Sequence, residues 1–241
     1  MKTRLDQTLV TRGLVPSRSQ GESYVRLGKV QVNGAVETKA GHMVSEHDTL
    51  KLLATEQYVS RAGLKLASVA DILNLDFKGK TVLDVGSSTG GFTDYVLKHG
   101  AVKVLAVEVG TNQLHPLLQG DPRIELHEKT DIRDFKTNQT VDIVVIDVSF
   151  ISLLDILPSV YRLCSANTEL VAMAKPQFEA ASQGQKHKGV IKNDAMRREI
   201  LKQLEIRVQE LFKIVDKRDS EVTGAKGNKE RFYLLKPINK T

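Results

Sequence analysis

The 241-residue chain contains one cysteine and no tryptophan, and aromatic residues make up only 5% of it. With a single thiol, Cys164, the chain cannot form an internal disulfide, and the apolar neighbours of this residue predict a buried position in a helix. No apolar run approaches the ~18 to 20 residues of a membrane-spanning helix, and the start MKTRLDQTLV lacks the apolar core of a secretory signal. We therefore expect a cytoplasmic protein with no membrane partner.

Metal ligands are sparse as well. The six histidines and the one cysteine show none of the spacings that are typical of zinc sites. His42 and His47 lie near each other in the sequence, but surface positions are the simpler interpretation of both. We expect no bound metal.

The net charge of +6 is distributed unevenly along the chain. Residues 1–60 hold 8 basic and 6 acidic side chains, residues 61–182 hold 12 and 15, and residues 183–241 hold 15 and 8. An acidic centre between basic ends is expected if a ligand binds the centre and a polyanion lies across both ends. A solvated basic helix face is the alternative explanation of the C-terminal excess.

The chain divides near residue 58, into a small domain over residues 1–58 and a larger one over 59–241. In the small domain we expect one helix over about residues 4–12 and a second that Ser17 can cap, running to about Leu27. Short strands over 30–32 and 49–53 follow, the first ending in a tight turn at Asn33-Gly34. Such a small α+β unit has no room for a catalytic pocket and suits a binding module.

Strands and helices alternate through the larger domain. This alternation predicts the α/β class, with a doubly wound, Rossmann-like parallel sheet. Beyond the strand that begins at Thr81, strands are expected over 102–109, 124–128, 141–148 and 170–174, then a helix from 193 or 194 to about 212, and a terminal antiparallel pair at 213–215 and 232–235.

The segment over residues 81–93 (TVLDVGSSTGGFT) reads as a buried strand that breaks into a glycine-rich turn and opens a helix. An open parallel sheet binds ligands outside the carboxyl ends of its strands. The spacing is D-x-G-x-x-x-G-G rather than the G-x-G-x-x-G of dinucleotide sites. Asp84 would repel a pyrophosphate but attract the cationic methionine part of S-adenosylmethionine, so the segment predicts a methyltransferase. An ordinary strand-to-helix turn is the alternative.

Three acidic residues end strands that should line the same crevice. Glu108 is placed to accept hydrogen bonds from the ribose hydroxyls of the cofactor, and Asp131 from the adenine amino group. Asp147 ends the central strand, beside the expected position of the transferred methyl group. The residues expected to bind S-adenosylmethionine are Asp84, Gly86, Ser87, Ser88, Gly90, Gly91, Phe92, Glu108, Asp131 and Asp147.

Residues 3–53 resemble the RNA-binding domain named after the ribosomal protein S-four, in the pattern R-L-D-x-x-L-V-x-R-G-L-x-x-S-R followed by G-x-V-x-V-N-G. The resemblance implies that Arg4, Arg12, Arg18 and Lys29 contact RNA phosphates, which give affinity without sequence choice. A small packing cap on the larger domain is the alternative. Further cations follow in the loop over residues 183–189, which includes Lys188, and in Arg197 beyond it; we expect this region to order on RNA.

Five motifs, spread over the whole chain, resemble the TlyA family, also called hemolysin A. They are YVSRAGLKL at 58–66, DVGSSTGGFT at 84–93, IDVSF at 146–150, KPQFE at 175–179 and GAKGNKE at 224–230. This resemblance implies an FtsJ-like enzyme that methylates ribose 2'-hydroxyls of ribosomal RNA or ribosomal subunits, with cytidine as the expected nucleotide. The chain departs from the family pattern after Glu179, where Ala180-Ala-Ser stands in place of a glycine, and after Ser220, which no proline follows.

The same resemblance implies a catalytic tetrad of Lys65, Asp147, Lys175 and Glu230. A 2'-hydroxyl must be aligned with the methyl group and must lose its proton as the bond forms. Lys175 is the candidate base, for which it would have to be partly neutral; alternatively it stays charged and only orients the hydroxyl. Asp147 and Glu230 would orient the two lysines, and Lys65 would position the ribose or its phosphate.

One aromatic residue and three competing functions remain open. Phe150 could stack on a flipped base or pack into the protein, and packing is slightly favoured. A non-catalytic ribosome-binding or assembly protein is the first alternative function, although the intact motifs argue against it. A pore-forming hemolysin lacks any supporting amphipathic segment, and a small-molecule methyltransferase would leave the basic ends unexplained.

Overall fold

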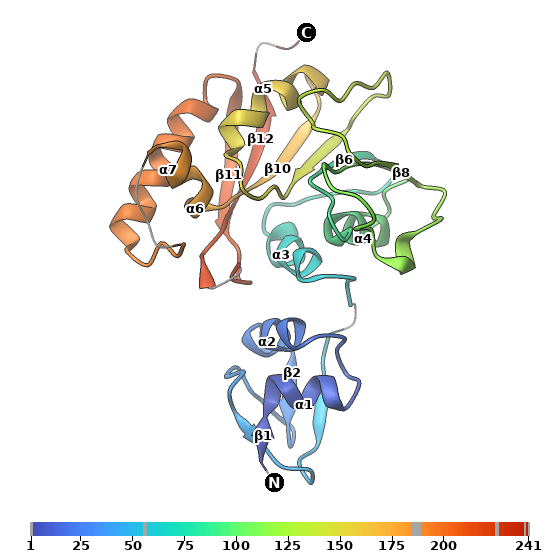
Figure 1. Ribbon diagram of the computed structural model, residues 1–241, viewed down its shortest axis with the longest axis vertical. Coiled ribbons are helices and arrows are strands. Elements are labelled where there is room, and N and C mark those ends of the chain that lie inside the picture. Colours follow the sequence, from blue (N-terminus) through green and yellow to red (C-terminus); the bar gives the residue numbers. More distant parts are fainter. Residues whose placement is uncertain (1, 55–56, 185–188, 225–226, 239, 241) are drawn as a thin grey trace.

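A computed structural model describes residues 2–54, 57–184, 189–224, 227–238 and 240. Figure 1 shows a small domain at one end of the long axis and a larger α/β domain at the other, with the two chain termini at opposite ends. Helix α2 (Arg18–Arg26) of the small domain faces helix α3 (Arg61–Ala70) of the larger one. None of the helices formed by the described residues is both long and apolar enough to span a membrane.

The small domain packs two helices against short antiparallel strands. Its elements are β1 (Thr3–Arg4), α1 (Leu5–Thr11), α2, β2 (Val30–Val32), β3 (Ala35–Val36), β4 (Met43–Val44) and β5 (Leu50–Leu52), with sheets β1-β4 and β3-β2-β5. Ser17 caps α2 by accepting a hydrogen bond from the backbone of Gln20. Asn33 and Gly34 adopt positive φ angles of 51° and 84°, as a tight hairpin turn requires. The predicted cap and the predicted turn are therefore confirmed.

The larger domain is built on a seven-stranded sheet of order β11-β12-β10-β9-β6-β7-β8. Strands β10, β9, β6, β7 and β8 are parallel, and β12 and β11 form an antiparallel pair at one edge. This arrangement confirms the predicted fold class. The strands are β6 (Thr81–Val85), β7 (Lys103–Val107), β8 (Ile124–His127), β9 (Ile143–Ile146), β10 (Glu169–Ala174), β11 (Phe212–Asp219) and β12 (Arg231–Pro237).

Helices cover both faces of this sheet, as doubly wound topology demands. Alternate strand residues supply two separate cores: Val82 points to the face that α3 and α4 (Gly91–Lys98) cover, and Leu83 to the opposite face. The second face is covered by α5 (Leu153–Leu163) and α7 (Asp194–Val208), while α6 (Pro176–Ser182) and the short 3-10 helix η1 (Pro116–Leu118) lie in loops.

Element bounds differ from the predictions most clearly at the ends of α7 and α5. The last helix ends at Val208 rather than near residue 212, because Phe212 is fully buried as the first residue of β11, paired with Pro237. Cys164 is buried as predicted, but it caps the end of α5 instead of lying inside the helix. Burial raises the pKa of this thiol to about 12, so it is unreactive at neutral pH.

The segment that joins the domains is bonded to both of them. The side chain of Gln20 donates to the carbonyl of Tyr58 at 2.9 Å, and the backbone N–H of Val59 donates to Asp94 at 2.9 Å. A groove of about 350 Å³ lies between α2 and α3, lined by the tetrad candidate Lys65 and by Arg61. The small domain is thereby held beside the larger domain's expected catalytic side chains.

Candidate active site

The glycine turn after β6 allows backbone segments to approach each other closely. Gly86 and Gly90 both adopt positive φ, at 79° and 84°. A Cβ atom at Gly86 would lie 2.8 Å from the carbonyl oxygen of Asp147, and one at Gly90 would lie 2.4 Å from the Leu118 side chain. Only glycine combines this backbone conformation with these contacts. The turn thus brings the end of β6 directly against the end of β9.

Asp84 is a buried carboxylate in which only one oxygen accepts a hydrogen bond from the described residues. Its Oδ2 accepts a 2.6 Å hydrogen bond from Thr93, whereas Oδ1 has no partner among the described residues. Burial raises the pKa of Asp84 to about 7, against the opposing Thr93 hydrogen bond and with help from the nearby Asp147 charge. A buried carboxylate oxygen without a partner costs free energy, and a cation placed beside it would remove that cost.

Two adjoining cavities follow the carboxyl ends of the central strands. A small one, of about 80 Å³, is lined by Asp84, by Ser87 with a buried hydroxyl that has no partner in the described chain, and by Asp147. A larger one, of about 420 Å³, also reaches Asp147 and extends over Glu108 and Asp131. These unsatisfied polar atoms and mixed polar and apolar walls fit a ligand with a cationic amino-acid end and a nucleoside end.

Glu108 and Asp131 are already oriented by their neighbours. The two oxygens of Glu108 accept from the backbone of Ser88 at 2.9 Å and of Gly110 at 2.7 Å. Asp131 pairs with Arg133, whose Nη2 lies 2.6 Å away, and this hydrogen bond holds the pKa of Asp131 below its usual value. Both residues line the larger cavity, where the structure brings them together as the sequence indicated.

The four tetrad candidates form two ion pairs, in which Lys65, Glu230 and Lys175 are buried and the Asp147 side chain is 15% exposed. Lys175 Nζ lies 2.6 Å from Asp147 Oδ1, and Lys65 Nζ lies 2.6 Å from Glu230 Oε2. Lys175 follows β10 and Asp147 follows β9, so the parallel pairing of these strands brings the two side chains together. Lys65 comes from α3, and Glu230 immediately precedes β12. Asp147 lies at the junction of the two cavities, and Lys175 is thereby held at their edge.

Ser149 is a site residue that sequence reasoning missed. Its hydroxyl accepts a 2.7 Å hydrogen bond from Lys175 Nζ and lines the larger cavity. Its position two residues after Asp147, within the quoted IDVSF motif, was the available signal. Lys175 is thus fixed from two sides, by a carboxylate and by a hydroxyl.

Glu179 supports this loop from behind. The buried carboxylate accepts from the hydroxyl of Ser152, in a very short hydrogen bond, and from the backbone of Leu153 at 3.0 Å. Burial raises the pKa of Glu179 to about 7, opposed by these two bonds. Ser152 and Asp155 form a capping box at the start of α5, a spacing that could have been found in the sequence. Glu179 therefore anchors the loop that carries Ser149.

Phe150 does not pack into the protein. Its side chain is 92% exposed at the mouth of the larger cavity, and its φ of 67° is unusual for a bulky residue. The ring tilts against Phe178 at 5.2 Å between centroids, and Lys175 Nζ lies 5.9 Å from the Phe178 centroid. The slight preference for packing was therefore wrong: the exposed Phe150 ring stands at the mouth of the cavity, and Phe178 lies between it and Lys175.

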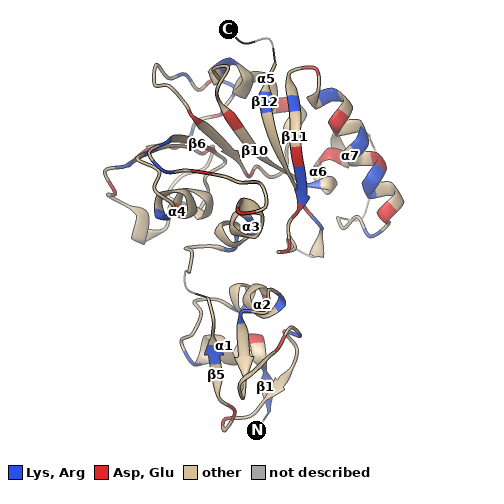
Figure 2. Ribbon diagram, turned by 180° about the vertical axis from the view of Figure 1, so that it is seen from behind, with Lys and Arg blue, Asp and Glu red and all other residues tan. Residues whose placement is uncertain are grey.

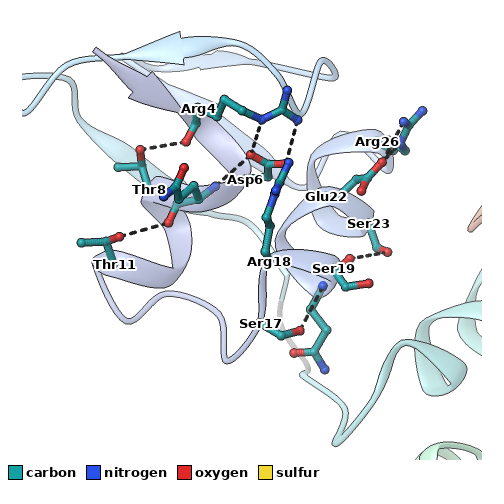
Figure 3. A network of polar contacts seen from close by, with 12 residues as sticks. Arg4, Asp6, Thr8, Thr11, Ser17, Arg18, Ser19, Glu22, Ser23 and Arg26 are labelled. Atoms are coloured by element: carbon teal, nitrogen blue, oxygen red, sulfur yellow. Dashed lines mark hydrogen bonds and ion pairs between the residues drawn. The ribbon is translucent and has the colours of Figure 1, made fainter. Parts of the chain in front are cut away.

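The expected RNA contacts separate into different environments. Arg4 and Arg18 both bond the buried Asp6, as Figure 3 shows, and the two arginine side chains remain exposed. Arg12 donates to three backbone carbonyls in the turn before β5, so it holds that turn together. Lys29 is exposed directly before β2.

Of the two predicted C-terminal RNA contacts, Lys188 and Arg197, the structure describes only Arg197. Arg197 is buried and pairs with Asp219 at 2.7 Å, so the expectation that it contacts RNA is corrected: it holds α7 to β11. Figure 2 shows acidic and basic residues interspersed on α7 and β11, and Lys217 there pairs with Glu205 at 2.7 Å. Lys188 lies outside the described residues.

Comparison with known proteins agrees with both halves of this architecture. The family described as FtsJ-like methyltransferase matches residues 58–236, and the S4 domain matches residues 3–50. The hemolysin A of Brachyspira hyodysenteriae is 37% identical over 94% of this chain and 97% of its own length. The 16S/23S rRNA (cytidine-2'-O)-methyltransferase TlyA of Mycobacterium tuberculosis (strain H37Rv) is 34% identical, covering 98% of this chain and 90% of its own.

A solved structure from Streptococcus thermophilus that carries the hemolysin name is similar over the whole fold. It superposes with a TM-score of 0.72 at 34% identity, covering 99% of this chain and 90% of that one. With an S4 domain followed by a methyltransferase domain that matches over residues 58–236, the chain belongs to the FtsJ-like methyltransferase family, within the S4-containing TlyA, or hemolysin A, group.

Proposed function

We propose that the protein transfers a methyl group from S-adenosylmethionine to a ribose 2'-hydroxyl of ribosomal RNA, with cytidine as the nucleotide. One observation carries the proposal. Lys175 is fixed by Asp147 and Ser149, which line a nucleoside-sized cavity whose mouth carries the exposed ring of Phe150. This arrangement can hold a hydroxyl at the cavity's opening and offer it a proton acceptor. The M. tuberculosis relative, which is named as a 16S/23S rRNA (cytidine-2'-O)-methyltransferase, supports the choice of substrate.

The cofactor assignment rests on the unsatisfied atoms of the two cavities. Bound S-adenosylmethionine supplies a methyl group activated by a sulfonium. Asp84 Oδ1 and Ser87 Oγ would receive its amino-acid end, and the oriented carboxylate of Glu108 would receive the ribose hydroxyls. Asp131 stays the proposed partner of the adenine amino group. The remaining proposed contacts come from the turn residues Gly86, Ser88, Gly90, Gly91 and Phe92.

Lys175 is the proposed general base. The hydroxyl proton must leave as the new oxygen–carbon bond forms, and a lysine accepts it only in the neutral state. Asp147 Oδ1, 2.6 Å from Lys175 Nζ, and the Ser149 hydroxyl, 2.7 Å away, orient this nitrogen at the edge of the cavity. Because these two residues hold the Lys175 nitrogen in place, less motion of the side chain has to be restrained to reach the transition state of methyl transfer.

Two surface features could guide the RNA to this site: the exposed ring of Phe150 and the groove between α2 and α3. Phe150 offers a stacking surface for a base turned out of its helix, in the manner of enzymes that act on single nucleotides. The groove between α2 and α3 leads from the S4 domain to Lys65, and Arg61 lines it. We propose that the flanking RNA backbone lies there, with Arg4, Arg18 and Lys29 contacting phosphates of ribosomal RNA or of a subunit in the cytoplasm.

Transfer of labelled methyl from S-adenosylmethionine to purified ribosomal subunits tests the proposal. Lys175→Ala should lower the rate by about 10²- to 10⁴-fold, the usual contribution of a positioned acid or base. Lys213→Ala, which removes an exposed lysine of β11, is the matched control and should keep full activity. Absence of label on free rRNA and on both subunits, despite measurable cofactor binding, would favour the non-catalytic assembly protein instead.

A further inference from the structure

Two arginines of the S4 domain share one buried carboxylate. Asp6 is 0% exposed and accepts from Arg4 through Nε at 3.1 Å and Nη2 at 2.8 Å, and from Arg18 through Nε at 3.1 Å. The same carboxylate accepts from the backbone of Gln7 at 2.9 Å. Figure 3 shows the two guanidinium groups meeting at Asp6 from β1 and from α2. The contact therefore joins two elements of the domain at one point.

This carboxylate is unexpected on a domain that binds a polyanion. Burying a charge is costly unless it is paired. Burial alone would raise the pKa of Asp6, but the hydrogen bonds from Arg4 and Arg18 outweigh it and hold the pKa below its usual value. Asp6 thus stays charged and subtracts from the positive charge that would attract RNA.

The arginines themselves remain accessible. Their side chains are 44% and 60% exposed, and a guanidinium has five N–H donors, of which only two on Arg4 and one on Arg18 bond Asp6. Arginine loses much rotamer freedom when it binds a phosphate, and a side chain already held in place loses less. Donors that a buried anion keeps in place can thus bind with a smaller entropic cost.

We propose that Asp6 is a positioning residue that holds Arg4 and Arg18 as a preorganised pair for phosphate oxygens of the RNA backbone. The inference rests on the proposed function, which makes ribosomal RNA the substrate. It deepens that function by assigning RNA affinity to an acidic residue. Asp6 itself does not touch the RNA.

An electrostatic role and a positioning role of Asp6 predict opposite changes in RNA affinity for the Asp6→Asn variant. The variant raises the net charge by one, so a purely electrostatic account predicts tighter RNA binding. The positioning account predicts weaker binding, by about tenfold for one mispositioned pair, with a salt dependence reduced by about one phosphate contact. Glu22→Gln is the matched control, since Glu22 is an acid of the same domain that pairs with Arg26 at its surface. That variant should bind RNA as tightly as wild type or more tightly.

The experiment measures binding to purified 16S and 23S rRNA at several salt concentrations, with thermal unfolding and S-adenosylmethionine affinity of each variant. We expect Asp6→Asn to weaken RNA binding and raise the KM for RNA, with kcat and cofactor affinity unchanged. Equal or tighter binding by a folded Asp6→Asn would overturn the inference and leave the proposed function intact.

A charge-conserving variant, Arg18→Lys, tests the inference if Asp6→Asn does not fold. Arg18→Lys keeps the charge but loses the Nε donor, so we expect it to weaken RNA binding about as much. Unchanged affinity in that variant would overturn the inference. If the wild type bound neither rRNA, the proposed substrate would be wrong and the inference would fall with it.

Discussion

Lys65 Nζ lies 2.6 Å from Glu230 Oε2, although the two residues come from opposite ends of the larger domain. Both side chains are buried, and Lys65 also lines the groove beside the S4 domain. A Cβ atom at Gly224 would lie 2.2 Å from Glu230 Oε1, so a glycine in the preceding loop leaves the carboxylate its space. The pair joins the first helix of the methyltransferase domain to its last strand.

Replacing only Glu230 should lower the unfolding free energy more than replacing both Lys65 and Glu230. Glu230→Leu leaves the Lys65 ammonium buried without its partner, and we expect a loss of ~3 to 5 kcal/mol in unfolding free energy. The double variant Lys65→Met/Glu230→Leu should recover most of that stability while remaining without methyl transfer. Denaturant unfolding and the transfer assay, run on the same preparations, check both parts. A double variant that regained activity would exclude the pair from catalysis.

Cofactor affinity should depend on pH through Asp84. Its pKa of about 7 in the free protein means that the carboxylate is increasingly protonated below pH 7, and only the ionised form attracts the cofactor's ammonium. We expect the Kd for S-adenosylmethionine to rise by up to about tenfold per pH unit below pH 7. The Asp84→Asn variant should bind S-adenosylmethionine weakly at pH 8, and its Kd should no longer depend on pH. Calorimetry between pH 5.5 and 8 measures it, with the exposed Asp71→Asn as control; a pH-independent wild type would contradict the assignment.

Glu179 should make the fold less stable as pH rises. Its pKa of about 7 in the folded state lies above the model-compound value of 4.5, so the folded protein binds more protons between these values. Stability from this residue is therefore present at pH 4.5 and falls as pH approaches 7. Glu179→Gln should flatten that part of the profile and be relatively more stable at pH 8. Melting temperatures at pH 5, 6, 7 and 8 test this; parallel profiles for the two proteins would refute it.

Phe150 should lower the stability of the fold while raising the rate of methyl transfer. Its positive φ strains the backbone, and glycine relieves such strain, by about 1 kcal/mol or more. Phe150→Gly should therefore melt at a higher temperature yet transfer methyl at least about tenfold more slowly, since a stacked base is worth ~1 to 3 kcal/mol. Phe150→Tyr keeps the ring and should retain activity. A Phe150→Gly variant with normal kcat and KM would remove the stacking role.

Features encoded by neighbouring residues could be predicted from the sequence. Ser17 caps a helix through a bond three residues away, and Asn33-Gly34 forms a turn within the same short stretch. The strand and glycine turn around Asp84 are equally local. The alternation of strands and helices then fixed the class of the larger domain, which the sheet order confirms.

Features that depend on residues distant in the sequence could not be predicted from it. The two-residue strands β1 and β4 pair residues that lie 39 and 41 positions apart, and no periodicity marks segments so short. Phe212 continues an apolar helical pattern, but its pairing with Pro237 makes it a strand residue. Arg12 and Arg197 have the composition of RNA contacts, yet one bonds backbone carbonyls and the other a remote carboxylate. A basic residue does not reveal its partner.

The identity of the methylated nucleoside tests the central claim most directly. Ribosomal subunits are incubated with the protein and S-adenosylmethionine, the rRNA is digested to nucleosides, and these are separated by mass spectrometry. The account predicts 2'-O-methylcytidine above the level of the untreated subunits, and none of this increase with Lys175→Ala. A methyl group on a base, or a ribose product undiminished in the Lys175 variant, would contradict the mechanism built on the Lys175–Asp147 pair.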